Sequence, residues 1–160
     1  MTAKEYAEQV ENELKDSWLA QIYRERILTM RTRSYELGAL QRDPRVEIQH
    51  TLLGVELKVG RRRLSCPDLA TARYLSVFAR AGCKGVAIPY DITRISRLAD
   101  ELESSWQRML LLANHYAVGR SEAFKHRING LLIDKLRAEI LAAGAGMPVP
   151  EFKKSTKQRV

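Results

Sequence analysis

The sequence contains little cysteine and no long apolar run, and each absence excludes a class of protein. Only Cys66 and Cys83 occur among 160 residues, and this pair fits neither a disulfide framework nor a zinc site. No apolar stretch approaches the roughly 18 residues that a membrane-spanning helix needs. Residues 1–18 mix acids with bases and lack the apolar centre of a signal peptide. We therefore expect a cytoplasmic protein that makes no contact with membranes.

Two further signatures are missing. The three histidines, His50, His115 and His126, show no metal-ligand spacing with the cysteines. The glycines form no phosphate-binding loop of the Walker or dinucleotide type. The cysteines are therefore expected to be buried as small apolar side chains, and charge becomes the main guide to function.

Positive charge is abundant and unevenly distributed. The formal net charge is +8, yet residues 1–30 carry six acidic and only four basic side chains. Residues 31–63 carry eight basic and four acidic side chains, and the segment after Pro150 adds four bases to one acid. Clustered cations attract polyanions and release their counterions. Nucleic acid is therefore the expected partner.

The N-terminal third predicts a helix followed by strands. Apolar residues at near-helical spacing, without Gly or Pro, predict a helix over about residues 3–32. Alternating apolar and polar residues predict strands at 46–52 and 55–59, joined by a turn at Leu53-Gly54. Gly60-Arg61 could close a second hairpin, and residues 34–40 could supply an earlier strand.

The remainder predicts helices around one buried strand. Ser65 is expected to cap a helix in which Asp68 completes a capping box and which ends at Gly82. Residues 85–89 read as a buried strand fed by this crossover helix. Two long helices follow, from Asp91 to about Val118 and from Ser121 through Ile140.

These elements together predict an α/β (α+β) fold. The expected order is an N-terminal helix, a small mixed β-sheet with a crossover helix, and two C-terminal helices. We expect residues 1–142 to form a single domain. Residues 143–160 read as a linker and a basic tail without stable structure.

The stretch GVELKVGRRR at residues 54–63 carries the candidate chemistry. The period of two along a strand places Glu56 and Lys58 on one face. Glu56 could bind Mg²⁺, which prefers oxygen ligands, and Lys58 could orient or deprotonate an attacking water. A second acid must come from the preceding segment, where Asp43 and Glu47 are the candidates.

This arrangement resembles the PD-(D/E)XK nuclease superfamily. In that superfamily an acid–x–Lys motif lies on the third strand of a core that runs helix, three strands, helix and strand. Glu56 and Lys58 match the motif, and Asp43 best matches the earlier acid. The resemblance covers about residues 34–91 together with the preceding helix. It implies cleavage of phosphodiester bonds, in DNA rather than in RNA, that depends on a divalent metal such as Mg²⁺.

Arginines around this motif are expected to bind phosphate, because the planar guanidinium suits phosphate oxygens. The predicted nucleic-acid-binding residues are Arg42, Arg45, Arg61, Arg62 and Arg63. Basic residues at the start of the last helix could extend the same surface: Arg120, Lys125, His126 and Arg127.

Three alternatives remain open at this stage. Glu56 and Lys58 could form only a polar strand face, with an ion pair to Glu47 or Arg63, and Asp43 could be a turn former. The protein could then bind nucleic acid without cleaving it. It could also be an interaction protein that forms homo-oligomers through its C-terminal helices, with Trp106 and Tyr116 in the interface.

Overall fold

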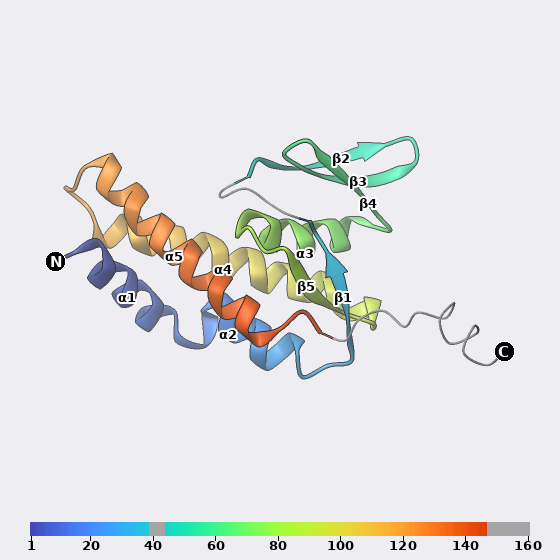
Figure 1. Cartoon of the computed structure of the whole chain (residues 1–160), viewed down its shortest axis with the longest axis horizontal. Helices are drawn as coiled ribbons and strands as arrows, with labels where there is room; N and C mark the ends of the chain where they lie inside the picture. The colour runs from blue at the N-terminus through green and yellow to red at the C-terminus, as the bar shows by residue number, and fades with distance from the viewer. Residues whose placement is uncertain (39–43, 147–160) are drawn as a thin grey trace.

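Long helices and two small antiparallel sheets make up the part of the chain that this computed structural model describes, residues 1–38 and 44–146 (Figure 1). Helices α1 (Ala3–Leu14), α4 (Ile95–Tyr116) and α5 (Glu122–Ala143) form an elongated body. Helix α3 (Leu69–Arg80) lies between this body and one of the sheets. The α+β class is confirmed, including the N-terminal helix and the two C-terminal helices.

The single helix expected over residues 3–32 is wrong. Helix α1 ends at Leu14 and is followed by the 3-10 turn η1 (Lys15–Ser17), α2 (Leu19–Ile22) and the π-helical turn η2 (Tyr23–Ile27). Lys15 adopts a φ of 50°, and Trp18 has an extended backbone. The buried Trp18 ring donates its Nε1 hydrogen to the Glu139 carboxylate at 3.2 Å. Tertiary packing of this indole therefore overrides the helical periodicity.

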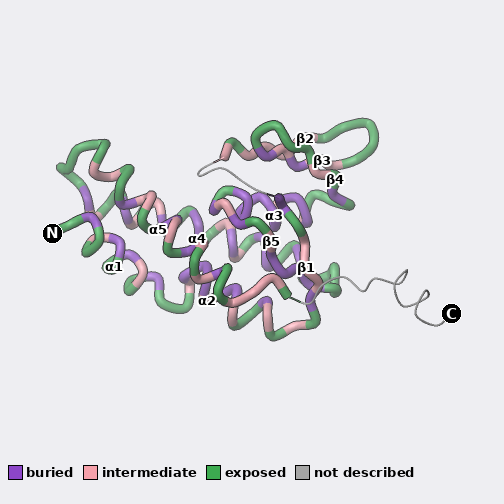
Figure 2. The backbone as a smooth tube through the Cα atoms, viewed as in Figure 1, coloured by how far each residue is buried: buried purple, intermediate pink, exposed green. Residues whose placement is uncertain are grey.

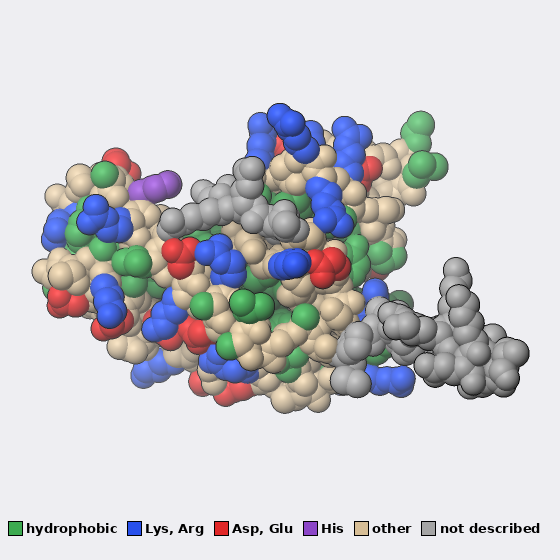
Figure 3. Space-filling model, viewed as in Figure 1, with side chains coloured by type: hydrophobic (Ala, Val, Ile, Leu, Met, Phe, Trp, Pro, Cys, Tyr) green, Lys and Arg blue, Asp and Glu red, His purple; other side chains and the backbone are tan. Residues whose placement is uncertain are grey.

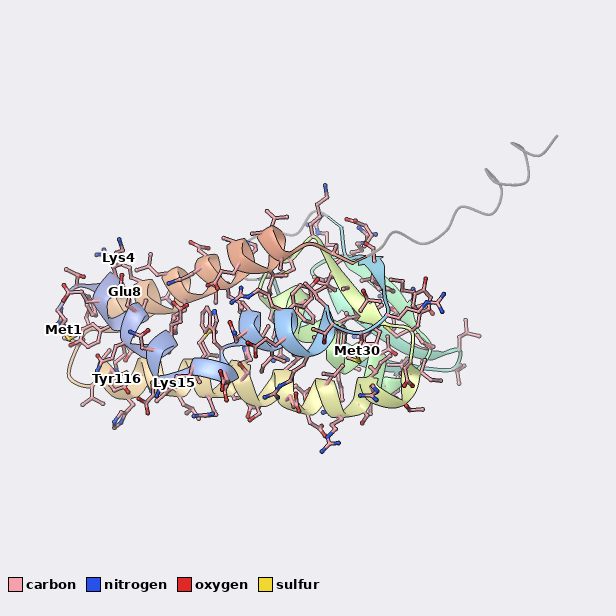
Figure 4. The ribbon with its side chains drawn as sticks, turned by 90° about the horizontal axis from the view of Figure 1, so that it is seen from below. Met1, Lys4, Glu8, Lys15, Met30 and Tyr116 are labelled. Carbon is pink, nitrogen blue, oxygen red and sulfur yellow. The ribbon has the colours of Figure 1, made fainter. Side chains whose placement is uncertain are left out.

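The N-terminal segment packs between the two C-terminal helices. Seen from below, α1 and α2 lie between α4 and α5 (Figure 4), and both helices contact α1. Ser121 is the N-cap of α5, accepting a hydrogen bond from the Phe124 amide at 3.1 Å. Asp91 precedes α4 and caps the 3-10 turn η3 (Ile92–Arg94). The start of α5 agrees with the prediction. Helix α4 itself begins later than predicted, at Ile95, because η3 follows Asp91.

Helix α3 begins differently from the expectation. Asp68 is its N-cap and accepts a hydrogen bond from the Thr71 amide at 2.8 Å. Ser65 instead lies within strand β4 (Arg62–Cys66), opposite Glu56. The predicted capping role of Ser65 is therefore wrong, because the strand continues to Cys66 and delays the helix start.

Strands β1 (Thr32–Glu36) and β5 (Gly85–Pro89) pair antiparallel and form one sheet. The predicted buried strand at 85–89 is confirmed, since residues 86–89 are all buried (Figure 2). Its partner β1 corresponds to the earlier strand expected at residues 34–40, but β1 begins at Thr32 and ends at Glu36. Helix α3 thus connects strand β4, which precedes it, to β5, which pairs with β1.

Strands β2 (Val46–Thr51), β3 (Gly54–Val59) and β4 form a second, three-stranded antiparallel sheet, here called the meander. Both predicted strands and the Gly60-Arg61 turn are confirmed. The β2–β3 turn falls one residue earlier than expected, at Leu52-Leu53. Within the described ranges the strands are thus divided between two antiparallel sheets, whereas one mixed sheet was expected.

The core joins the helices to the β1–β5 sheet. The Tyr23 hydroxyl donates to the Gly144 carbonyl at 2.6 Å and accepts from the Ala87 amide at 2.9 Å. Cys66 and Cys83 are both buried, as expected, and burial raises the pKa of the Cys83 thiol to about 12. None of the helices that the structure describes is long and apolar enough to cross a membrane. Residues 147–160, most of the predicted tail, lie outside the described part.

Candidate nucleic-acid interface

The meander has one apolar and one polar face. Its apolar face packs on α3 and buries Leu57 and Val59. The opposite face, here called the outer face, carries the polar side chains of all three strands: Glu47, Gln49, Glu56, Lys58, Arg63 and Ser65. The prediction that Glu56 and Lys58 share a strand face is confirmed, and Glu47 joins them from the neighbouring strand.

Two cross-strand rows organise the outer face. Lys58, on the central strand, lies between Glu47 on β2 and Arg63 on β4. Glu56 lies between Gln49 and Ser65 in the adjacent row. Side chains directly opposite one another are close enough to interact, and diagonal neighbours are within reach of long side chains. The row order therefore places a lysine directly beside an arginine of the same charge.

Each acid on the outer face already has a cationic partner. The Arg63 Nε lies 3.5 Å from Glu56 Oε1, so the open alternative of an ion pair between these residues is confirmed. Glu47 Oε1 pairs with the Arg45 guanidinium at 2.7 Å. Among the residues that the structure describes, neither Lys58 nor Arg61 has a carboxylate within ion-pair distance. These two cations are therefore free to meet an external anion.

Arg62 is directed away from the outer face. It lies opposite Val59, and its guanidinium occupies the space beside Gly38 at the end of the β1 segment. Because Gly38 has a φ of 90° and no side chain, the Arg62 head can approach its backbone closely. The structure thus separates Arg62 from Arg63 and Lys58, although Arg62 and Arg63 were predicted to bind nucleic acid together.

Glu56 has an unusual environment for a charged side chain of this face. Its Oε1 atom is buried and accepts no hydrogen bond, although the side chain as a whole is 22% exposed. The contact with Arg63 is an ion pair without hydrogen-bond geometry. An oxygen with a vacant lone pair in such a position could accept a donor or a cation.

Two of the three acids predicted to bind a metal ion, Glu47 and Glu56, lie on the outer face. Glu47 and Glu56 occupy diagonal positions on adjacent strands. Mg²⁺ commonly uses one or two carboxylates and completes its shell with water, so this pair fits the donor chemistry. In residues 1–38 and 44–146 there is no group of three or more His, Cys, Asp or Glu side chains that could hold a metal ion. Asp43 and Arg42 lie outside the described residues.

A cleft adjoins the first residues of the meander. It has a volume of about 850 Å³ and lies between Pro44 and Val46 on one side and α4 and α5 on the other. His126 and Arg127 line it, together with the Asn129 side chain, whose Oδ1 is buried without a partner. Of the four residues at the start of α5 that were predicted to extend the basic surface, His126 and Arg127 thus lie at this cleft. Arg120 instead lies over the Phe124 ring, at 3.9 Å.

The side chains most clearly missed by sequence reasoning are Leu52 and Leu53. Their relative exposures are 106% and 100%, the highest of the large apolar residues in the described ranges. The signal was present in the sequence, since two leucines occupy a turn position that usually holds Asn, Asp or Gly. The predicted turn at Leu53-Gly54 was one residue too late and left Leu52 in a strand.

Blue side chains of Lys and Arg gather over the meander in the space-filling view, at the top of the molecule (Figure 3). Residues 45–66 contribute five basic and two acidic side chains.

Trp106, a candidate for a subunit interface, is instead buried at 7% exposure within its own chain. Compared with known proteins, this chain matches no protein-family model, no curated protein and no solved structure.

Proposed function

We propose that this protein is a cytoplasmic nucleic-acid-binding protein and that the outer face of the meander contacts the phosphate backbone. The observation that carries the proposal is the placement of Lys58 directly opposite Arg63. Like charges in opposite positions destabilise a sheet. A bound phosphate would offset this repulsion and would release its own counterions.

The ion pairs on the face support the same function. Glu47 and Glu56 are compensated by Arg45 and Arg63, so they add little negative potential. Lys58 on the central strand and Arg61 in the β3–β4 turn remain available for external anions. Because neither cation must first leave a carboxylate within the described structure, binding at this face requires little rearrangement.

Salt-dependent binding tests the proposal. We expect a double variant, Lys58→Gln with Arg61→Gln, to weaken binding to duplex DNA and to reduce the slope of log K against log salt by about 1.8, or about 0.9 for each lost contact. The matched control is Arg97→Gln with Arg108→Gln, which removes the same charge from exposed positions on α4. Equal effects of the two double variants would contradict a role for the meander.

Metal-dependent phosphodiester cleavage is the second candidate function. It is favoured by Glu47, Glu56 and Lys58 sharing one face and by the vacant Oε1 of Glu56. Glu47 and Glu56 would hold Mg²⁺ and Lys58 would orient a water molecule. The resemblance to the nuclease superfamily implies these roles for Glu56 and Lys58 and assigns the earlier acid to Asp43, which lies outside the described residues. A bound Mg²⁺ would supply charge stabilisation at the phosphate.

A nicking assay tests this second function separately. Wild-type protein in Mg²⁺ or Mn²⁺ should cut supercoiled DNA, and Glu56→Ala should abolish cutting while retaining binding. Cutting by Glu56→Ala at the wild-type rate would remove the catalytic proposal and leave the binding proposal intact.

A further inference from the structure

The end of the β2–β3 hairpin is an exposed apolar tip. Leu52 and Leu53 form its two-residue turn, and both side chains are fully exposed. In the space-filling view, hydrophobic atoms project beyond the sheet at its right-hand end (Figure 3). Single exposed apolar residues are ordinary on soluble proteins, whereas a pair that projects from a hairpin presents a small apolar surface to a partner.

The turn is held in a defined shape. The Thr51 hydroxyl accepts a hydrogen bond from the Leu53 amide at 3.2 Å and donates one to the Gly54 carbonyl at 3.1 Å. Gly54 has a φ of 130°, which allows the chain to reverse after two non-glycine residues. The leucines are therefore presented on a closed turn that loses little conformational freedom on binding.

The charge around the tip restricts the partner. The hairpin belongs to a sheet with five basic and two acidic residues between positions 45 and 66. A suitable partner combines a dense negative charge with an apolar interior that two leucines can enter. Double-stranded DNA has both, since its stacked bases lie between two phosphate backbones.

The residue types of the meander favour duplex DNA over single-stranded nucleic acid as the partner. Proteins that bind single-stranded nucleic acid commonly stack bases on Phe, Tyr or Trp. Residues 45–66 contain none of these three. Aliphatic side chains such as leucine instead serve as wedges between base steps of a duplex, entered from the minor groove.

The dimensions of the hairpin fit a duplex. Strand β3 has six residues between the apolar tip and the Gly60-Arg61 turn. At about 3.3 Å per residue, these two ends lie roughly 20 Å apart. That length spans about six base pairs at 3.4 Å each, or more than half a helical turn. The tip could therefore enter a groove while Arg61 and Arg63 contact phosphates elsewhere on the duplex.

We propose that the Leu52-Leu53 turn is a wedge that enters the minor groove of double-stranded DNA and unstacks one base step, which kinks the duplex. This inference rests on the proposed nucleic-acid-binding function and adds the substrate class and the mode of contact. Pyrimidine–purine steps such as TA unstack most easily, so they are the preferred wedge positions.

The test uses the full chain and a duplex of about 30 base pairs with a central TA step. 2-Aminopurine at that step reports unstacking, and a fluorophore pair at the ends reports bending. We expect wild-type protein to raise the 2-aminopurine fluorescence and to shorten the end-to-end distance. Leu52→Ser with Leu53→Ser should lose both signals and bind about tenfold more weakly, with an unchanged salt slope. Leu141→Ser, at an exposed position of α5, is the control and should behave as wild type.

Each other outcome overturns the wedge in a distinguishable way. If the wild type binds DNA but the double serine variant keeps both signals, the wedge is excluded and the binding function remains. If the wild type binds no duplex or single strand at low salt, the binding function itself fails. Leucine-dependent binding to anionic phospholipid vesicles, or leucine-dependent dimerisation in sedimentation, without DNA unstacking would assign the tip to a lipid surface or to a second copy.

Discussion

The Nε of Arg63 lies 3.5 Å from Oε1 of Glu56, diagonally across the β3–β4 strand pair. This contact couples the two candidate functions, because Arg63 is a predicted phosphate ligand and Glu56 a predicted metal ligand. An incoming phosphate would compete with Glu56 for the arginine. Under the proposed function, the carboxylate would thus limit how strongly the outer face binds anions.

Replacing Glu56 with Gln removes the anion and retains the shape of the side chain. We expect Glu56→Gln to bind duplex DNA a few times more tightly at low salt and to steepen the salt slope by up to about 0.9, because Arg63 becomes available. Fluorescence anisotropy at several salt concentrations measures both quantities. Glu101→Gln, which removes an anion paired with Arg26 away from the meander, should leave the slope unchanged. Weaker binding by Glu56→Gln would contradict this view of the pair.

Lys15 occupies a backbone conformation that favours glycine. Its φ of 50° and ψ of −116° lie where a Cβ atom is strained. We therefore expect Lys15→Gly to stabilise the protein by about 1 kcal/mol, seen as a rise in Tm of roughly 2–4 °C. Gln9→Gly, at an exposed position within α1, is the control and should lower stability by about 1 kcal/mol. A lower Tm for Lys15→Gly would show that the break has another cause.

The Tyr23 hydroxyl should make stability depend on alkaline pH. Burial raises the pKa of Tyr23 to about 12, from an ordinary value of 10. Because the folded-state pKa is the higher one, this contribution to stability is complete below pH 10 and is lost as the pH rises towards 12. Denaturant unfolding from about pH 9 to about pH 12 measures the decrease in the free energy of unfolding.

Tyr23→Phe separates the hydroxyl from the ring. The variant should lose about 1–3 kcal/mol at neutral pH, since the Ala87 amide and the Gly144 carbonyl both lose their partner. Its stability should then fall less steeply than that of the wild type above pH 10. An identical alkaline slope in the two proteins would assign the pH dependence to other groups, such as Tyr74, whose pKa burial also raises.

The start of α3 provides a fourth prediction. Asp68→Ala should destabilise the protein by about 1 kcal/mol, because the Thr71 amide loses its capping acceptor. Ser65→Ala should change stability by less than about 0.5 kcal/mol, because Ser65 is an exposed strand residue. Thermal unfolding of the two variants distinguishes the two cap assignments, and a larger effect at Ser65 would restore the sequence-based one.

Local signals explain which elements could be predicted. The starts of η3 and α5 follow from Asp91 and Ser121, and the hairpins follow from strict alternation of apolar and polar residues. The break at Lys15 gives no such signal, because neither Gly nor Pro marks it and the cause is the distant contact of Trp18 with Glu139. The pairing of β1 with β5 is similarly set by packing between segments far apart in sequence.

The same distinction holds for the candidate site. The period of two correctly placed Glu56 with Lys58, and it equally separates Arg62 from its two neighbours. Grouping three consecutive arginines into one basic region ignored that alternation. The partner of Glu56 could not be chosen from sequence, since both Lys58 and Arg63 lie near it and the strand register decides which of them it meets.

The division of the strands into two sheets has a consequence for which amino-acid substitutions the fold can tolerate. The outer face belongs to a meander supported mainly by α3, and its strands share no ladder with β1 and β5 in the described ranges. The proposed binding would use the exposed face of the meander, whereas most of the buried core lies in the helices and the β1–β5 sheet. Under the proposed function, substitutions on the outer face would therefore alter what the protein binds while the helical scaffold and its central tyrosine remain intact.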